Sequence, residues 1–166
     1  MKRFGIVALI IIIIGGLGYY LKNQREETSK EFVSTAVNEY PPMSATNADG
    51  SQFRLNELKG NNILVFFQPD CDHCQREGKA IADNLEKFSE YQLYFISVDD
   101  FNQMNVFAGN YDLADKRNVA FARATLDDIL NNLGRISPPS LYIYREGKLI
   151  KHLDGEKNIE EILGYI

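Results

Sequence analysis

A short apolar run at residues 63–67 constrains the fold of this chain more than any other feature. The run reads Ile-Leu-Val-Phe-Phe between turn residues, as in a strand that is buried on both faces of an α/β sheet. From Cys74 on, apolar residues recur at helical spacing as far as Phe88, which predicts a helix of about four turns. Residues 91–98 form a second apolar run. Two buried strands joined by a helix predict a β-α-β unit with parallel strands.

The two ends of the body of the chain predict antiparallel strands. The Asp-Gly pair at 49–50 is a strong hairpin signal. Residues 141–144 and 148–153 are strand-like and are joined at a Glu-Gly pair, and residues 158–166 form an amphipathic closing helix. Parallel and antiparallel pairs together require a mixed sheet. We therefore expect an α/β fold, with a mixed β-sheet flanked by helices on both faces and an N-terminal β-hairpin.

Residues 1–21 have the composition of a transmembrane helix that is separate from this domain. Lys2 and Arg3 precede an uncharged segment, residues 4–21, that includes five consecutive isoleucines. At ~1.5 Å rise per residue the segment reaches about 27 Å, enough for a hydrocarbon core. We expect an uncleaved signal-anchor, with a cleaved signal peptide or a buried soluble helix as alternatives. Residues 22–41 are interpreted as a linker, and residues 42–166 as one domain.

Charge and cysteine content exclude several classes of protein. Lys and Arg number 18 against 23 Asp and Glu, a net charge of −5, and no basic run occurs, which argues against a nucleic-acid surface. Two cysteines and two histidines exclude a disulfide-rich miniprotein and a four-cysteine zinc module. Both cysteines fall in one four-residue window, so that window is the candidate site.

Cys71 and Cys74 form a Cys-x-x-Cys motif between the strand at 63–67 and the helix that follows. At the start of a helix, unpaired backbone N–H groups and the positive end of the dipole stabilise a thiolate, so Cys71 is expected to be the attacking thiol. Cys74 lies a turn further on and is expected to resolve, closing a disulfide with Cys71. His73 can stabilise the Cys71 thiolate, whereas the aspartates on either side of Cys71 oppose it. The motif predicts thiol–disulfide exchange, and these opposing charges leave its redox potential open.

The same pair of cysteines allows other interpretations. Half of a structural zinc site would need further ligands, and the chain has one other histidine, His152. Two thiolates and His73 could form a Cu(I) site. An inert disulfide would close a very short loop and gain little loop-closure entropy. His73 could also be an exposed helix residue without a role. Redox chemistry is favoured over these alternatives.

These residues resemble the thioredoxin superfamily over residues 42–166. Its strand-to-helix active site is similar to Val65-Phe66-Phe67-x-x-x-Cys71-x-x-Cys74. The N-terminal hairpin of its membrane-anchored branch, the TlpA-like thiol–disulfide oxidoreductases, resembles Asp49-Gly50-x-x-Phe53-x-Leu55-x-x-Leu58-Lys59-Gly60. The cis-proline loop of the superfamily is similar to Pro139-Ser140-Leu141, and Gly155 near the last helix also fits. The resemblance implies a thioredoxin-like fold.

The resemblance also implies roles for residues outside the motif. Pro139 would follow a cis peptide bond that places backbone beside the cysteines for substrate pairing. Pro138 would present its backbone to Cys71, or would only stiffen the loop. Glu77 stands three residues after Cys74, where reductases of this branch often have a glutamate implicated in proton handling. Its alternative is a solvated helix residue.

The sequence departs from the family pattern close to the motif. Pro69 and Asp70 stand where a tryptophan usually precedes the first cysteine, and no proline lies between the cysteines. Val65 stands where cytoplasmic thioredoxins carry a buried aspartate that helps to deprotonate the second cysteine. These differences bear on the redox potential and on the partner rather than on the fold.

We therefore expect an extracytoplasmic, membrane-tethered thiol–disulfide oxidoreductase that reduces or exchanges disulfides in protein substrates. It would need no cofactor and no metal, its partners would be proteins with disulfides or dithiols and a membrane thiol donor, and nucleic acid is not expected. Basic residues on both flanks of the apolar segment leave its orientation undecided. The resemblance implies a single-pass protein of the bacterial inner membrane with a periplasmic domain. The alternatives are a Cu(I)-handling module and a peroxiredoxin-like peroxide reductase, although no threonine lies between Pro69 and Cys71.

Overall fold

The computed structural model describes residues 15–20 and 39–166, in two separate units that divide after Thr35. In the first unit, residues 15–20 are helical. Among the described residues, no helix has both the length and the apolar character that crossing a membrane requires. The predicted signal-anchor, residues 1–21, and the predicted linker, residues 22–41, lie mostly outside the described residues.

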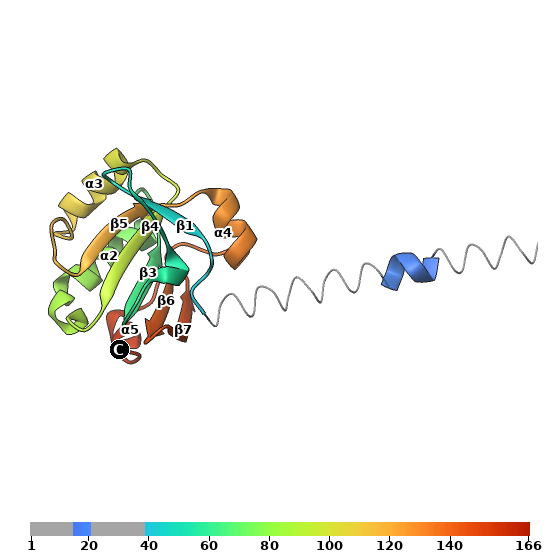
Figure 1. Ribbon diagram of the computed structural model, residues 1–166. Coiled ribbons are helices and arrows are strands. Elements are labelled where there is room, and N and C mark those ends of the chain that lie inside the picture. Colours follow the sequence, from blue (N-terminus) through green and yellow to red (C-terminus); the bar gives the residue numbers. More distant parts are fainter. Residues whose placement is uncertain (1–14, 21–38) are drawn as a thin grey trace, which may run out of the picture. The chain divides into compact units, whose positions relative to one another are not determined.

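The second unit is an α/β domain in which strands and α-helices alternate from β3 to β6, with a pair of consecutive strands at each end (Figure 1). Its strands are β1 (Ser44–Asn47), β2 (Gln52–Arg54), β3 (Asn62–Phe66), β4 (Gln92–Ser97), β5 (Val119–Arg123), β6 (Ser140–Arg145) and β7 (Lys148–Asp154). Its α-helices are α2 (Asp72–Asp83), α3 (Phe101–Asn110), α4 (Leu126–Leu133) and α5 (Ile159–Leu163), and short 3₁₀ helices are η1 (Leu55–Glu57) and η2 (Leu85–Phe88).

All seven strands form one sheet in the order β2-β1-β5-β4-β3-β6-β7. The central strands β3, β4 and β5 are parallel, and β6 and β7 continue the sheet antiparallel on one side. On the other side the β1–β2 hairpin is added antiparallel through β1 to β5. The predicted mixed sheet and N-terminal hairpin are therefore confirmed.

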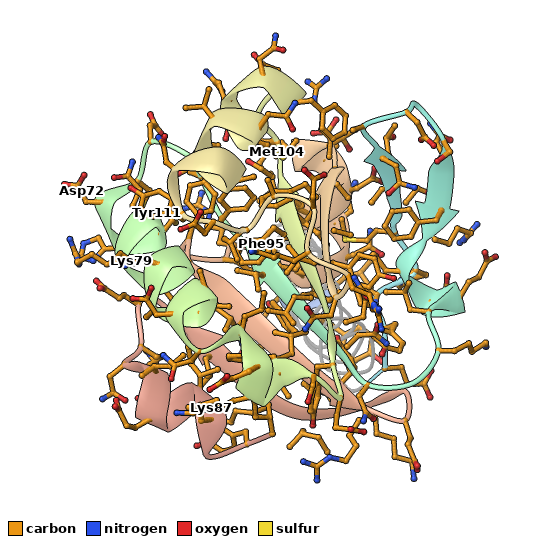
Figure 2. All side chains as sticks on the ribbon, turned by 90° about the vertical axis from the view of Figure 1, so that its left-hand side faces the viewer. Asp72, Lys79, Lys87, Phe95, Met104 and Tyr111 are labelled. Atoms are coloured by element: carbon orange, nitrogen blue, oxygen red, sulfur yellow. The ribbon has the colours of Figure 1, made fainter. Side chains whose placement is uncertain are left out.

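Helices cover both faces of the sheet, as predicted. Figure 1 shows α2, α3 and α5 on one side and α4 on the other. The apolar run at residues 63–67 serves both cores, because alternate residues of a strand point to opposite faces. Ile63 and Val65 pack in the cluster below α2, α3 and α5, and Leu64 and Phe66 pack in the cluster below α4. Figure 2 looks onto the first of these faces, with Phe95 between α2 and α3.

The domain begins before residue 42. Tyr40, which the sequence placed in the linker, is buried in the core below α4 and stacks on Tyr144 with ring centroids 4.1 Å apart. Its hydroxyl accepts a hydrogen bond of 2.6 Å from Nδ2 of the buried Asn62. A large ring with a satisfied hydroxyl is stable in such a core, so the end of the predicted linker belongs to the domain.

Helix α2 is shorter than the predicted four turns. It ends at Asp83, and the apolar stripe continues in η2, where Phe88 is buried. At Asn84 the backbone N–H turns to the carbonyl of Ile81, and the side-chain Nδ2 donates to the carbonyl of Ala80 at 3.0 Å. That carbonyl is the acceptor that a continuing α-helix would offer to the Asn84 N–H. The asparagine side chain therefore ends the helix, which periodicity alone does not reveal.

Gly78 lets α2 approach α3 closely. A Cβ built on Gly78 would lie 2.6 Å from Cζ of Phe107, whose ring is buried and packs against Phe67 and Phe121. Because this ring has little room to move, Gly78→Ala should lower the free energy of unfolding by about 1–3 kcal/mol, despite the better helix propensity of alanine. Urea denaturation measures this change.

Gly109 provides the matched control on the facing helix. It lies in α3, and a Cβ built there meets no atom within 4 Å. Gly109→Ala should therefore leave the stability unchanged or raise it by up to about 1 kcal/mol. Equal effects of the two substitutions would contradict the close packing of α2 on Phe107.

Candidate active site

The Cys-x-x-Cys motif lies where the chain leaves β3 and enters α2. Cys71 is the N-cap residue of α2, with extended backbone (φ −84°, ψ 119°), and its carbonyl accepts the first helical hydrogen bond from Gln75 N–H at 3.0 Å. Its side chain is half-buried and makes no capping hydrogen bond. The first cysteine therefore stands at the start of a helix, as the sequence predicted, and its side chain is partly exposed.

Cys74 lies behind Cys71 and is 2 % exposed. The backbone N–H of Gln68 donates to its Sγ at 3.5 Å. Burial raises the pKa of the Cys74 thiol to about 12, a rise that the Gln68 N–H opposes and that Cys71 and Glu77 reinforce. Both cysteines are free thiols in this structure. Cys74 is thus a protonated thiol at neutral pH and needs a base before it can attack a disulfide.

Glu77 is buried, so its alternative as a solvated helix residue is wrong. It is 2 % exposed and lies one helical turn after Cys74 on the buried side of α2. Its Oε2 accepts a 2.8 Å hydrogen bond from the backbone N–H of Lys157, whereas its Oε1 is buried without a partner. Burial raises the pKa of Glu77 to about 7, opposed by the Lys157 N–H and reinforced by the charge of Glu156. Near neutral pH the side chain can therefore both release and accept a proton.

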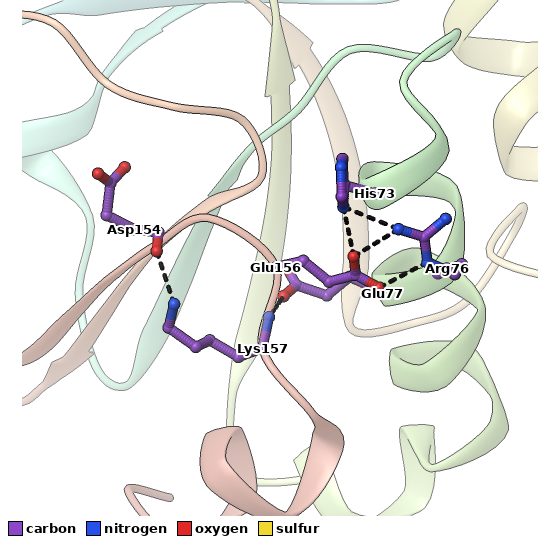
Figure 3. A network of polar contacts seen from close by, with 6 residues as sticks. All are labelled: His73, Arg76, Glu77, Asp154, Glu156 and Lys157. Atoms are coloured by element: carbon purple, nitrogen blue, oxygen red, sulfur yellow. Dashed lines mark hydrogen bonds and ion pairs between the residues drawn. The ribbon is translucent and has the colours of Figure 1, made fainter.

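His73 points to a carboxylate rather than to a cysteine sulfur (Figure 3). Its Nδ1 lies 2.5 Å from Glu156 Oε2, and Arg76 holds the same carboxylate with Nε at 2.8 Å from Oε1 and Nη2 at 2.6 Å from Oε2. These donors, Arg76 first, lower the pKa of Glu156 to about 2. The sequence did not identify Arg76 or Glu156 as site residues. Helical spacing from His73 and proximity to Gly155 were the available signals.

The predicted proline loop lies beside the strand that leads to the cysteines. The Pro138–Pro139 peptide bond is cis, and Pro139 precedes β6. In the sheet Ser140, the first residue of β6, pairs with Phe66, the last residue of β3, so the loop and the Cys-x-x-Cys motif lie at the same end of these two strands. Pro138 is half-buried and, with Gln68, lines an apolar pocket of about 280 Å³ that extends to α4.

The two histidines have partners other than the cysteines. Across residues 15–20 and 39–166, no three His, Cys, Asp or Glu side chains lie close enough together to hold a metal ion. His73 is engaged by Glu156, and His152 stacks on Tyr142 and pairs through Nε2 with Ser140 Oγ at 2.8 Å.

Comparison with known proteins identifies the family. The model of the AhpC/TSA family matches residues 37–132. This chain belongs to the AhpC/TSA family. The thiol-disulfide oxidoreductase ResA of a Bacillus cereus strain is 27% identical over 164 residues, covering 96% of this chain and 92% of ResA. The chloroplastic peroxiredoxin Q of Gentiana triflora is 31% identical over 77 residues, covering 44% of this chain and 36% of that protein.

A solved structure gives the same fold. A secreted Mycobacterium tuberculosis disulfide oxidoreductase homologous to E. coli DsbE superposes with a TM-score of 0.63 at 19% identity, over 75% of this chain and 93% of that chain. The thioredoxin-like fold and the predicted TlpA-like membership are therefore confirmed. The same similarities support the predicted class of enzyme, a thioredoxin-like thiol–disulfide oxidoreductase.

Proposed function

We propose that this AhpC/TSA family member is a membrane-tethered reductase of protein disulfides that works on the extracytoplasmic side. One observation carries the proposal: the half-buried Cys71 begins α2, and the buried Cys74 lies one turn behind it as a protonated thiol. An accessible first sulfur can capture a substrate, and a shielded second sulfur can release it without being attacked first.

The redox groups of the protein in this reaction are the two cysteine thiols. The Cys71 thiolate attacks one sulfur of the substrate disulfide, and the other substrate sulfur leaves as a thiolate that takes a proton. Cys74 then loses its proton, and its thiolate attacks Cys71 Sγ in the mixed disulfide. The Cys71–Cys74 disulfide forms, and the second substrate sulfur departs as a thiolate and is protonated. Two electrons pass to the substrate, and another dithiol must return them to the enzyme.

Glu77 is suited to accept the Cys74 proton. The two residues are three apart in α2, a spacing that brings side chains within about 5–6 Å at Cβ. Its unpartnered Oε1 is free to accept, and its raised pKa lies near neutral pH. A general base is most effective when its pKa is close to the working pH.

The substrate chain would lie across Pro138. This residue borders the apolar pocket, whose far wall is α4 with the exposed side chains of Leu126 and Leu130. An extended segment could pair with the loop backbone while one apolar side chain enters the pocket. This supports protein substrates over small thiols, which have no use for an apolar pocket of this size.

The membrane tether rests on the N-terminal sequence. The uncharged segment at 4–21, after Lys2 and Arg3, is long enough for a hydrocarbon core, and an extracytoplasmic domain is accessible to a membrane dithiol donor. Disulfide chemistry of protein substrates also belongs to oxidising compartments outside the cytoplasm. Fractionation of cells that express the full chain, with protease access to the domain, tests this part of the proposal.

A peroxide reductase is the second candidate, because the AhpC/TSA model and peroxiredoxin Q match the chain. In a peroxidase, hydrogen peroxide would be consumed at least as fast as a protein disulfide is reduced. The residues before Cys71, Pro69 and Asp70, contain no threonine to approach the peroxide. Comparing the two rates on the reduced enzyme separates the candidates.

Substrate trapping tests the proposed function directly. Cys74→Ala removes the resolving thiol and keeps Cys71, so a mixed disulfide with a protein substrate should accumulate to near one equivalent, against only a small fraction for the unmodified enzyme. Non-reducing gels and mass spectrometry measure the adduct. Failure of Cys74→Ala to accumulate a mixed disulfide would contradict capture by Cys71, which is then the one cysteine left in the chain.

A further inference from the structure

The last residue of β7 and the first three residues after it, residues 154–157, contact both parts of the site. We call this segment the connector. Its Glu156 carboxylate holds His73 and Arg76 on the outer side of α2, and the Lys157 backbone N–H holds Glu77 on the inner side. Figure 3 shows the connector passing beside the first two turns of α2.

The connector also holds the cis-proline loop. The Asp154 carboxylate accepts the Ser137 N–H at 3.0 Å, and the Gly155 N–H donates to the Ser137 carbonyl at 3.3 Å. Gly155 has a positive φ of 72°, which glycine adopts without steric cost. The Lys157 Nζ donates back to the Asp154 carbonyl at 2.6 Å and closes the turn. A single short segment thus joins the helix of the cysteines to the loop that would face the substrate.

Glu156 pairs with the charged side chain of Arg76 near the dithiol. Its carboxylate pairs with the Arg76 guanidinium through two hydrogen bonds, so the negative charge of Glu156 compensates the positive charge of Arg76. Arg76 lies in α2 five residues after the N-cap Cys71, which at ~1.5 Å rise per residue is within a Debye length of it along the helix axis. The other charged groups that face the pair are Asp72, beside Arg76, and Glu77 and Lys157, beside Glu156.

We propose that Glu156 is a positioning residue of the dithiol site. By pairing with Arg76 and His73, its carboxylate compensates the positive charge of Arg76 near Cys71, although Glu156 lies outside the Cys-x-x-Cys motif. The proposal rests on the proposed function only in that the Cys71–Cys74 pair is redox-active. It assigns a role to a residue that is distant in sequence and makes no contact with either sulfur.

Glu156→Gln is the sharpest test, because glutamine keeps a hydrogen-bond acceptor for Arg76 and removes the negative charge. With Arg76 no longer neutralised, the Cys71 thiolate is better stabilised. We expect the rate of Cys71 alkylation by iodoacetamide at pH 6 to rise about threefold. The equilibrium of the dithiol with glutathione should move by a similar factor toward the reduced protein, which makes the disulfide more oxidising.

Asp83→Asn is the matched control. Asp83 pairs with Lys79 at the far end of the same helix, so the substitution also removes one carboxylate charge from an exposed ion pair of α2. At the ~1.5 Å rise per residue of a helix, Asp83 is more than a Debye length from Cys71, and salt screens its charge. Neither the alkylation profile nor the glutathione equilibrium should change. Glu156→Asp, which keeps the charge, should retain the profile of the unmodified protein.

The outcomes separate this inference from the proposed function. The role of Glu156 would be overturned if Glu156→Gln changed neither the Cys71 alkylation rate at pH 6 nor the glutathione equilibrium. It would also be overturned if Asp83→Asn shifted both equally. If Glu156→Gln lowered the urea midpoint but left the alkylation rate and the glutathione equilibrium unchanged, Glu156 would have a merely structural role, which would also overturn the proposal. Neither measurement uses a protein substrate, so failure to trap substrates would overturn the proposed function alone.

Discussion

Cys71→Ser should abolish disulfide reduction, lowering the rate constant for reduction of a protein disulfide by on the order of 10³-fold or more. The serine hydroxyl is nearly isosteric with the thiol but is not ionised at neutral pH, so the helix N-terminus has no thiolate to stabilise. The remaining thiol cannot substitute, because Cys74 is 2 % exposed and burial raises its pKa to about 12. Stopped-flow reduction of a protein disulfide measures the loss.

Cys74→Ser is the control for this experiment. It also exchanges one thiol for a hydroxyl but keeps the half-buried Cys71, so the first attack should proceed at close to the unmodified rate and stop at one mixed disulfide per chain. The opposite pattern, in which Cys71→Ser reacts and Cys74→Ser does not, would assign the attack to the buried sulfur and sink the proposed mechanism.

The sequence predicted those parts of the fold that depend on local pattern. The run at 63–67 was interpreted as a strand buried on both faces, and β3 does contribute alternate residues to two cores. The hairpin turn expected from the Asp-Gly pair at residues 49–50 is present, and so is the cis bond before Pro139 that the family resemblance implied. In each case the residue types that carry the prediction are adjacent in the chain.

The features that the sequence did not predict depend on contacts between distant segments. Glu156 lies 80 residues from Arg76 in the chain, and no periodicity links a surface glutamate to a helix so far away in sequence. The Glu77 carboxylate has an ordinary place in a helix, and only the packing of the connector over it shows that it is buried with one unpartnered oxygen. The early end of α2 is different, because it depends on a local contact that is set by the side-chain conformation of Asn84.

Burial of Glu77 should make the stability of the domain depend on pH. The pKa of Glu77 rises from an ordinary 4.5 to about 7 on folding, so the folded state favours the protonated form. The resulting stabilisation is complete below the unfolded pKa and is lost as the pH rises through about 7. At about 1.36 kcal/mol per pKa unit, this group should lower the free energy of unfolding by about 2–3 kcal/mol between pH 5 and pH 8.

Glu77→Gln should remove this pH dependence and slow catalysis at the same time. Without a base for the Cys74 proton, release of the mixed disulfide at pH 7 should slow on the order of 10²-fold. The rate should recover at high pH, as Cys74 ionises without help, whereas the unmodified enzyme should show an inflection near the Glu77 pKa. Urea denaturation at pH 5 and pH 8 and the pH profile of mixed-disulfide release measure the two effects.

Glu161→Gln is the control for both measurements, because it neutralises an exposed glutamate whose backbone N–H, not its carboxylate, makes the cap of α5. It should change neither the pH dependence of stability nor the release rate. If Glu77→Gln slows release but leaves the pH dependence of unfolding intact, burial does not raise the pKa of Glu77. A raised pKa would then not explain how Glu77 accepts the Cys74 proton. If the pH dependence disappears while release is unaffected, another group accepts that proton. If Glu77 is a buried base whose raised pKa costs stability, Glu77→Gln should remove the pH dependence of unfolding and slow release together.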